Sequence, residues 1–157
     1  MIKFIKGNLF DTDAQIICHQ CNCYGVMGSG VAKEVKQRYP NVFKDYRNDY
    51  ENGKLKLGYV CFSPTENCKG QIIANMCGQN YYGYSSKQYT DYNKLQECFN
   101  KVVEYAKDKY NSTKPKIAFP YRMSCCRGGG DWNVLLKMIE NSFRDFEVEI
   151  WRLEERH

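Results

Sequence analysis

Residues 16–40, IICHQCNCYGVMGSGVAKEVKQRYP, contain the pattern that decides the fold. The stretch begins as an apolar strand, passes through a loop with Gly25, Gly28 and Gly30, and continues as a helical pattern that stops at Pro40. Backbone N–H groups of such a loop and the positive end of the helix dipole attract an anion. The stretch therefore predicts an anion site between a strand and a helix.

The whole chain has the length and composition of one domain, residues 1–157. Its 23 basic and 18 acidic residues give a net charge of +5, and no block of like charges indicates a nucleic-acid-binding tail. Nine cysteines, an odd number, argue against a complete disulfide framework, and the start of the chain does not read as a signal peptide. These features predict a cytoplasmic protein, and no apolar run is long enough for a membrane span.

Apolar periodicity predicts alternating strands and helices along the rest of the chain, which is typical of an α/β fold with helices on both faces of a sheet. A loop over residues 78–90 interrupts the alternation and carries several tyrosines. The expected strands cover residues 1–5, 14–18, 58–62, 71–77, 116–119 and 148–153, and the expected helices cover residues 31–39, 42–50 and 91–110 and a segment after Asp131.

A second glycine loop, SCCRGGGDW, occupies residues 124–132 and again lies between a strand and a helix. Ligands of open α/β sheets bind beyond the carboxyl ends of the strands, so two such loops at one edge could hold a diphosphate between them. The common phosphate motifs are absent. Lys33 stands where the last glycine of G-x-G-x-x-G belongs, and there is no P-loop sequence and no cysteine phosphatase signature.

The cysteine-rich segment around Cys18, Cys21 and Cys23 could suggest zinc together with His19. No second, separated C-x-x-C pair exists, so buried free thiols are the favoured interpretation and no metal or cofactor is expected. Cys125 or Cys126, beside Arg127, remains a minor candidate for a nucleophile.

Three polar residues beside the glycine loops are candidates for function, and each has a structural alternative. His19 could act as an acid or base, or form a hydrogen bond under the loop. Asn22 could contact a ribose hydroxyl or stabilise the turn. Asp131 could activate a water or cap the following helix. Gln79, Lys87 and the tyrosines of the long loop could cover a ligand, and their roles stay open.

Three segments together resemble the macrodomain family of ADP-ribose-binding modules. They are GNLF from Gly7, the run ICHQCNCYGVMGSGVAKEVKQRYP and the run PYRMSCCRGGGDWNVLLKMIE, and the resemblance spans residues 3–153. The chain is most similar to the branch with the yeast-type ADP-ribose 1''-phosphate phosphatase, phage homologues and terminal ADP-ribose protein glycohydrolase. The resemblance implies a three-layer α/β/α sandwich with a central mixed sheet.

The resemblance also implies where ADP-ribose would bind. Asn8, which stands where many macrodomains have aspartate, would lie with Leu9 against the adenine, and Leu153 would line the same side. Asn22 and Cys23 would lie near the distal ribose. The diphosphate would be enclosed by Met27, Gly28, Ser29, Gly30 and Val31 on one side and by Ser124, Cys125, Cys126, Arg127, Gly128 and Gly129 on the other.

The implied activity is hydrolysis at the distal ribose C1'', acting on ADP-ribose 1''-phosphate or on an ADP-ribosyl ester. The implied ligands are ADP-ribose and ADP-ribosylated protein or nucleic acid. The glycohydrolase branch uses a lysine and an aspartate at positions that this sequence does not match, with Gln79 near the lysine position and Gly128 near that of the aspartate. A water-based mechanism with His19 and Asp131 is therefore expected. The alternative is a non-catalytic reader of ADP-ribose, and a monomer is favoured for either function.

Overall fold

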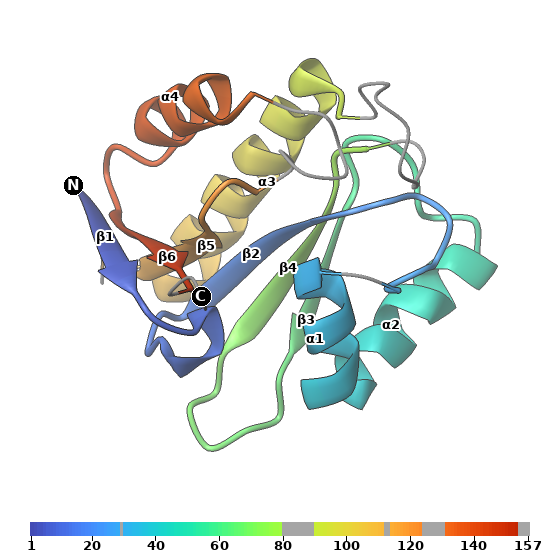
Figure 1. Cartoon of the computed structure of the whole chain (residues 1–157). Helices are drawn as coiled ribbons and strands as arrows, with labels where there is room; N and C mark the ends of the chain where they lie inside the picture. Colours follow the sequence, from blue (N-terminus) through green and yellow to red (C-terminus); the bar gives the residue numbers. More distant parts are fainter. Residues whose placement is uncertain (29, 80–89, 112–113, 124–130, 154–157) are drawn as a thin grey trace, which may run out of the picture.

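The central feature of the computed structural model is a six-stranded mixed sheet with helices on both faces (Figure 1). The structure describes residues 1–28, 30–79, 90–111, 114–123 and 131–153. Its strands are ordered β1-β6-β5-β2-β4-β3, and β3 alone among them runs antiparallel to its neighbour. The strands are β1 (Ile2–Lys6), β2 (Ile16–Cys21), β3 (Val60–Pro64), β4 (Ile72–Cys77), β5 (Lys116–Pro120) and β6 (Glu147–Arg152).

Two hydrophobic clusters, one on each face, make the sheet the middle of three layers. One face is covered by α3 (Tyr92–Tyr110) and α4 (Trp132–Ser142), and the other by η1 (Leu9–Asp11), α1 (Gly30–Arg38) and α2 (Pro40–Glu51). The expected α/β/α sandwich with a mixed sheet is confirmed.

The central strand β2 is buried on both faces because its side chains alternate between the two clusters. Ile16 and Cys18 belong to the cluster under α3 and α4, and Ile17 and Cys21 to the other. This explains the nearly continuous apolar run in the sequence.

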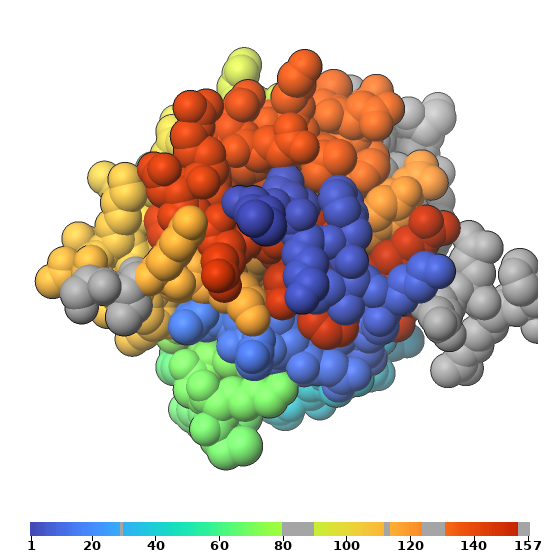
Figure 2. All heavy atoms as spheres, turned by 90° about the vertical axis from the view of Figure 1, so that its left-hand side faces the viewer, coloured from blue at the N-terminus to red at the C-terminus, as the bar shows by residue number. Residues whose placement is uncertain are grey.

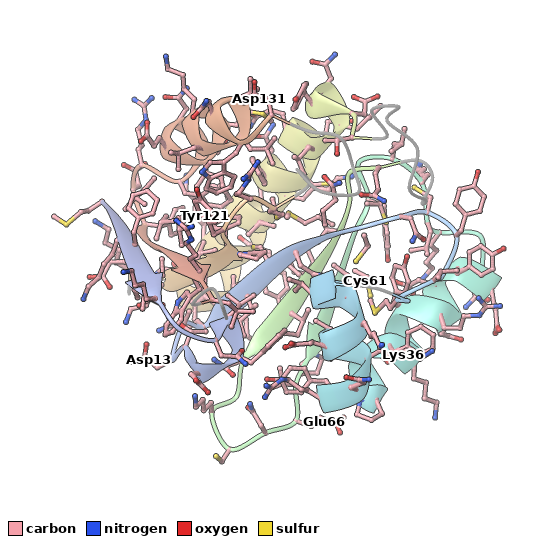
Figure 3. All side chains as sticks on the ribbon, in the orientation of Figure 1. Asp13, Lys36, Cys61, Glu66, Tyr121 and Asp131 are labelled. Carbon is pink, nitrogen blue, oxygen red and sulfur yellow. The ribbon has the colours of Figure 1, made fainter. Side chains whose placement is uncertain are left out.

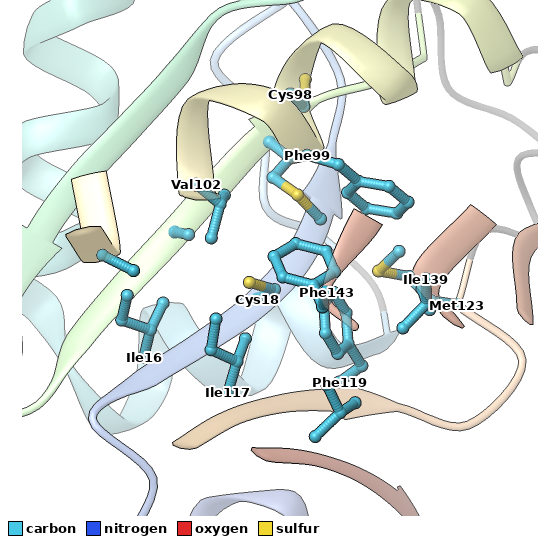
Figure 4. Packing of buried hydrophobic residues seen from close by; sticks show 14 of the residues in the cluster. Ile16, Cys18, Cys98, Phe99, Val102, Ile117, Phe119, Met123, Ile139 and Phe143 are labelled. Atoms are coloured by element: carbon cyan, nitrogen blue, oxygen red, sulfur yellow. The ribbon is translucent and has the colours of Figure 1, made fainter. Parts of the chain in front are cut away.

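Three aromatic rings join the helices of one layer to the sheet (Figure 4). Phe99 from α3, Phe119 from β5 and Phe143 at the end of α4 pack edge to face, with ring centroids 5.2–5.9 Å apart. The end of α4 is therefore packed against both α3 and β5.

One of the two edge strands of the sheet is β1, which lies at the surface beside α4 (Figure 2). Phe4 is exposed there between the exposed side chains of Lys3 and Lys6. Lysines on an edge strand discourage pairing with another chain.

Most element boundaries lie one or two residues from the predicted ones, and the end of β2 and the start of α2 are the instructive cases. β2 extends to Cys21 rather than ending at Cys18, because it pairs with β4 along its whole length up to Cys21 and Cys77. Pro40 ends the first helical pattern as expected, but it is also the first residue of α2, where its missing N–H costs nothing. Asp91 caps α3, and Asp131 caps α4, which is one of the two roles that the sequence suggested for Asp131. Within the described part of the chain, no helix combines the length and apolarity that crossing a membrane requires.

Candidate functional site

Five parallel strands, all but β3, end at one edge of the sheet, and most of the described candidate residues follow them. β2 and β5 are neighbours, so the loop after β2 and the first residues after β5 start from this edge. β1 and β6 end at the same edge, where Gly7 N donates to Arg152 O at 2.9 Å. Asn8 and Leu153 directly follow this pair. The topology thus brings together segments that are far apart in the sequence, at the place where α/β sheets bind ligands.

The loop of residues 22–28, here the first loop, is organised around Asn22. This side chain is 7% exposed. Its Nδ2 donates to Val26 O at 2.9 Å, and its Oδ1 accepts the N–H of Tyr24 at 2.9 Å. The amide therefore closes the turn, which is the structural role that the sequence left open.

Helix α2 packs against the outer side of the first loop. The buried Tyr46 hydroxyl donates to Asn22 O at 2.6 Å and lies 3.0 Å from its Oδ1. Arg47 Nη1 donates to Gly25 O at 3.3 Å. Gly25 has φ +72°, and a Cβ there would lie 2.8 Å from the Tyr50 ring. Only glycine fits this position, and the loop is fixed before any ligand arrives.

The backbone is exposed at the end of the first loop and at the start of α1. Met27 is 1% exposed and packs into the core, so a ligand could reach only its backbone. Gly28 is exposed, and Gly30 has φ +60° with nothing within 4 Å of a Cβ position. Val31 is partly buried against the same cluster. An anion could approach the N–H groups here without a clash.

His19 lies inside the sheet rather than at its edge, because β2 continues for two more residues. It is 1% exposed, and its Nε2 lies 2.6 Å from Asn75 Oδ1, to which it donates. Burial lowers the pKa of His19 to about 4, although the hydrogen bond to Asn75 opposes the shift. The ring is therefore neutral at pH 7, and this geometry favours the structural role over acid–base work.

Cys23 is the half-buried thiol of the first loop. Its Sγ donates to Gln79 O at 3.5 Å, just beyond the end of β4. Gln79 in turn accepts a hydrogen bond from Gln20 Nε2 at 2.7 Å. The first loop is thus connected to β4 as well as to α2.

The other side of the site is the start of α4, where Asp131 caps the helix (Figure 3). Its Oδ1 accepts the N–H of Asn133 at 2.8 Å, and its carboxylate is exposed. Its own N–H donates to the Tyr92 hydroxyl at 2.8 Å. Trp132 packs edge to face on Tyr121, with centroids 5.2 Å apart. The sequence did not indicate that Tyr92 contacts Asp131. In the sequence, Tyr92 is only a partly apolar residue in the first turn of a helix.

The candidate adenine contacts lie beyond β1 and β6. Asn8 caps η1, with its Oδ1 accepting the N–H of Phe10 at 2.9 Å. Leu9 is buried, so only its backbone could meet a base, whereas Leu153 is 62% exposed. The remaining predicted contacts lie outside the described residues: Ser29, Lys87, Ser124, Cys125, Cys126, Arg127, Gly128 and Gly129.

The cysteines do not form a metal centre in the part of the chain that the structure describes. No group of three or more His, Cys, Asp or Glu side chains there could hold a metal ion. The described cysteines are free thiols, most of them buried. Burial raises the pKa of Cys61 and of Cys98 to about 12 in each case, which makes them unreactive.

Comparison with known proteins identifies relatives over the whole chain. The sequence model of the Macro domain family matches residues 18–139. An ADP-ribose 1''-phosphate phosphatase from Saccharomyces cerevisiae is 30% identical over 122 residues, 74% of this chain and 69% of that protein. An uncharacterized 17.5 kDa protein of phage T4 is 26% identical over 96% of this chain and 95% of its own length.

A DNA ADP-ribosyl glycohydrolase from Thermus aquaticus is 23% identical over 96% of this chain, but the match spans only 40% of that longer protein. Among solved structures, the macrodomain of Mycobacterium tuberculosis DarG superposes with a TM-score of 0.82 at 22% identity, covering 96% of this chain and 97% of that one. Thermosipho africanus DarTG in complex with ADP-ribose gives a TM-score of 0.81 at 18% identity, over 99% of this chain and 42% of that one. These structural matches show that the fold is shared.

Proposed function

Because the chain belongs to the macrodomain family, we propose that it binds ADP-ribose along the edge where β1, β2, β5 and β6 end. We further propose that it hydrolyses an ADP-ribose derivative at the distal ribose C1'', either ADP-ribose 1''-phosphate or an ADP-ribosyl ester. The observation that carries the binding proposal is the first loop, which is fixed by α2 and opens onto free space at Gly28 and Gly30.

The geometry supports a single orientation of the ligand. The diphosphate would lie over Gly28 and Gly30, where backbone approach is unhindered and the helix dipole of α1 favours negative charge. The adenine would lie toward Asn8 and Leu153. The distal ribose would lie toward Asn22, whose Nδ2 carries two N–H groups and gives one of them to Val26. The other N–H can donate to a ribose hydroxyl.

Asp131 is the residue that we assign to water activation. Hydrolysis adds one water across the bond between the distal ribose and its substituent, and an exposed carboxylate can accept the proton that the attacking water loses. Asp131 is exposed at the start of α4, and its cap bond uses Oδ1. The released substituent leaves as phosphate or as a free carboxylate of the modified partner.

A second candidate function is a reader that binds ADP-ribose without turnover. Two observations favour it: the Asp131 carboxylate has a complete structural role as a cap, and His19 is buried and neutral. A test that separates the reader from the enzyme needs substrates of both kinds, because one relative is named for ADP-ribose 1''-phosphate and another for DNA ADP-ribosyl groups.

The deciding experiment combines calorimetry with a release assay. We expect micromolar or tighter binding of ADP-ribose, and release of ADP-ribose from at least one of three substrates: ADP-ribose 1''-phosphate, an ADP-ribosylated protein and an ADP-ribosylated DNA oligonucleotide. Binding without any release would establish the reader. No measurable binding would reject both functions.

Asp131→Asn separates catalysis from capping, because asparagine caps helices as well as aspartate does. Loss of a general base predicts a rate about 100-fold lower or more, with little change in the affinity for ADP-ribose. Asp91→Asn is the matched control, since the Asp91 side chain caps α3 in the same way by accepting the N–H of Lys94 at 3.0 Å. Equal rates in the two variants would remove Asp131 from the mechanism.

A further inference from the structure

Tyr92, in the first turn of α3, lies between the two sides of the proposed site. On the side of the first loop, Cys23 Sγ donates to Gln79 O at 3.5 Å, and Gln79 forms a β-bridge with Thr90. Tyr92 follows Thr90 by two residues, and on the other side its hydroxyl accepts the N–H of Asp131 at 2.8 Å. A row of contacts therefore runs from the first loop through Tyr92 to the residue assigned to water activation.

The position of the Tyr92 hydroxyl is fixed by the packing of its ring and by the start of its helix. The ring is partly buried against the hydrophobic cluster under α3 and α4. The preceding residue, Asp91, caps α3 by accepting the N–H of Lys94 at 3.0 Å, and its own N–H donates to Gly78 O at 2.9 Å, just beyond β4. Because Tyr92 is held in this way, a ligand that contacts its hydroxyl orders little that is not already ordered.

The hydroxyl of Tyr92 still has its hydrogen to donate. A tyrosine hydroxyl carries one hydrogen and can also accept a hydrogen bond. Toward Asp131 it is the acceptor, since the backbone N–H donates in that bond, and none of the described residues accepts the hydroxyl hydrogen. The Asp131 carboxylate is used only through Oδ1 among these residues, where it accepts the N–H of Asn133. A donor and a carboxylate oxygen are therefore both available to one ligand at the start of α4.

Hydrolysis of a phosphoryl or acyl group needs a hydrogen-bond donor as well as a base. When water attacks such a group, negative charge grows on its unesterified oxygen, and a fixed donor stabilises that charge. Two other polar side chains near the first loop are already engaged. His19 is buried and donates to Asn75, and the free N–H of Asn22 is assigned to a hydroxyl of the distal ribose. Tyr92 adds a donor beside the proposed base.

We propose that the Tyr92 hydroxyl donates a hydrogen bond to the substituent on the distal ribose, at an unesterified oxygen of its phosphoryl or acyl group. In the proposed orientation the distal ribose lies toward Asn22, so its substituent extends from the first loop toward Tyr92 and Asp131. This inference rests on the proposed function and assigns the residue that recognises the substituent. Free ADP-ribose lacks that group, so Tyr92 distinguishes the substrate from the product. No proton is transferred from Tyr92.

Tyr92→Phe tests the contact, because it keeps the packed ring and removes only the hydroxyl. The N–H of Asp131 is exposed and can bond to water instead. Release of ADP-ribose from a substrate that the natural chain hydrolyses should slow by about 100-fold. Calorimetry in the Asp131→Asn background, where turnover is slow, should find ADP-ribose 1''-phosphate bound about 10-fold more weakly once Tyr92 is replaced. The affinity for ADP-ribose should change by less than about twofold, because ADP-ribose lacks the group that Tyr92 contacts.

Tyr105→Phe is the matched control. Tyr105 lies on the same helix, about 20 Å further along its axis, and is partly buried against the same hydrophobic cluster. Its ring stacks on Phe62 of β3, with centroids 4.0 Å apart. The control variant should keep the rate and both affinities of the natural chain, and the thermal transition of each variant shows that it is folded.

The difference between the two ligands decides between recognition and a merely structural role for Tyr92. Equal losses of affinity for ADP-ribose and for its 1''-phosphate in Tyr92→Phe, or no change in rate and affinity, would overturn the contact and leave the proposed function standing. Slower release from an ADP-ribosylated protein with unchanged affinity for the 1''-phosphate would assign the contact to an acyl oxygen. A natural chain that binds both ligands without turnover should still show the 10-fold difference. A natural chain that binds neither would reject the proposed function and the role of Tyr92 with it.

Discussion

The two sides of the site are built differently. The first loop is fixed from outside by Tyr46 and Arg47 of α2, and the amide of Asn22 is used within the turn. The start of α4 instead exposes the Asp131 carboxylate, which is fixed through one oxygen and through the bond from its N–H to Tyr92. One side is therefore a preformed surface that exposes backbone N–H groups, and the other presents a carboxylate to solvent.

This difference separates binding from chemistry. A loop whose polar side chains are already used can recognise an anion through its N–H groups at little cost in conformational entropy. A group that transfers protons has to be accessible, and among the two residues expected to do so only Asp131 is exposed, since His19 is buried. Substitutions on the first-loop side should therefore act on affinity or stability, and those on the α4 side on turnover.

Gly28→Glu should produce the largest effect on the first-loop side. Gly28 is not among the glycines with positive φ, and a Cβ there would make only an ordinary contact, 3.6 Å from Val26. The substitution is therefore tolerated, whereas Gly30, at φ +60°, would be strained by any side chain. A carboxylate beside the diphosphate should weaken ADP-ribose binding by about 100-fold or more, which is roughly 3 kcal/mol.

Calorimetry on matched variants separates charge from bulk at Gly28. Gly28→Gln has nearly the same size without the charge and should lose markedly less affinity. On the other side, Asn133→Asp adds a negative charge to the exposed first turn of α4 and should change affinity by less than about threefold. Equal losses from Gly28→Glu and Asn133→Asp would contradict the assignment of the diphosphate to the first loop.

His19, under the first loop, predicts a pH-dependent stability of about 2 kcal/mol. Its pKa is about 4 when folded, against an ordinary value of 6.5, so the unfolded chain binds more protons between these values. Stability should fall as pH decreases through 6.5, and the loss should be complete near pH 4. Urea titrations should find the protein less stable at pH 5 than at pH 7 by about 2 kcal/mol.

A control for this titration is His19→Gln, which can still donate to Asn75 but does not titrate. Its stability should change little between pH 7 and pH 5. The hydrogen bond to Lys116 is the main cause of the lowered pKa of Asp13. Protonation of Asp13 therefore changes stability only below about pH 4, and it does not affect the comparison between pH 5 and pH 7. A natural chain as stable at pH 5 as at pH 7 would show that His19 is not held neutral in the folded state.

Local patterns predicted most of the fold and the position of the first loop. The apolar run at Ile16, the cap at Asp131 and the break at Pro40 all depend on interactions between near neighbours in the chain. Such interactions can be read from one sequence. The pairing of β2 with β4 up to Cys21 could not, since it depends on a strand more than fifty residues away.

The same distinction applies to the site. The sequence identified Asn22 and Asp131 as candidates, because polar residues beside glycine loops are conspicuous. It could not predict that Tyr46 of α2 donates to Asn22 or that Tyr92 of α3 accepts the N–H of Asp131. In the helical pattern Tyr46 was only an apolar position, and the destination of its hydroxyl depends on how α2 packs.

The smallest predicted effect is that of Tyr46→Phe, which tests whether α2 preforms the first loop. The change removes one buried hydroxyl that donates to Asn22, and such a hydrogen bond is worth about 1 kcal/mol. Both the free energy of unfolding and the affinity for ADP-ribose should fall by about this amount, the latter about fivefold. Tyr50→Phe is the matched control, because the Tyr50 ring packs on Gly25 from the same helix and its side chain is exposed. It should leave both quantities unchanged. Stability lost in Tyr46→Phe with affinity retained would mean that the ligand, rather than α2, orders the loop.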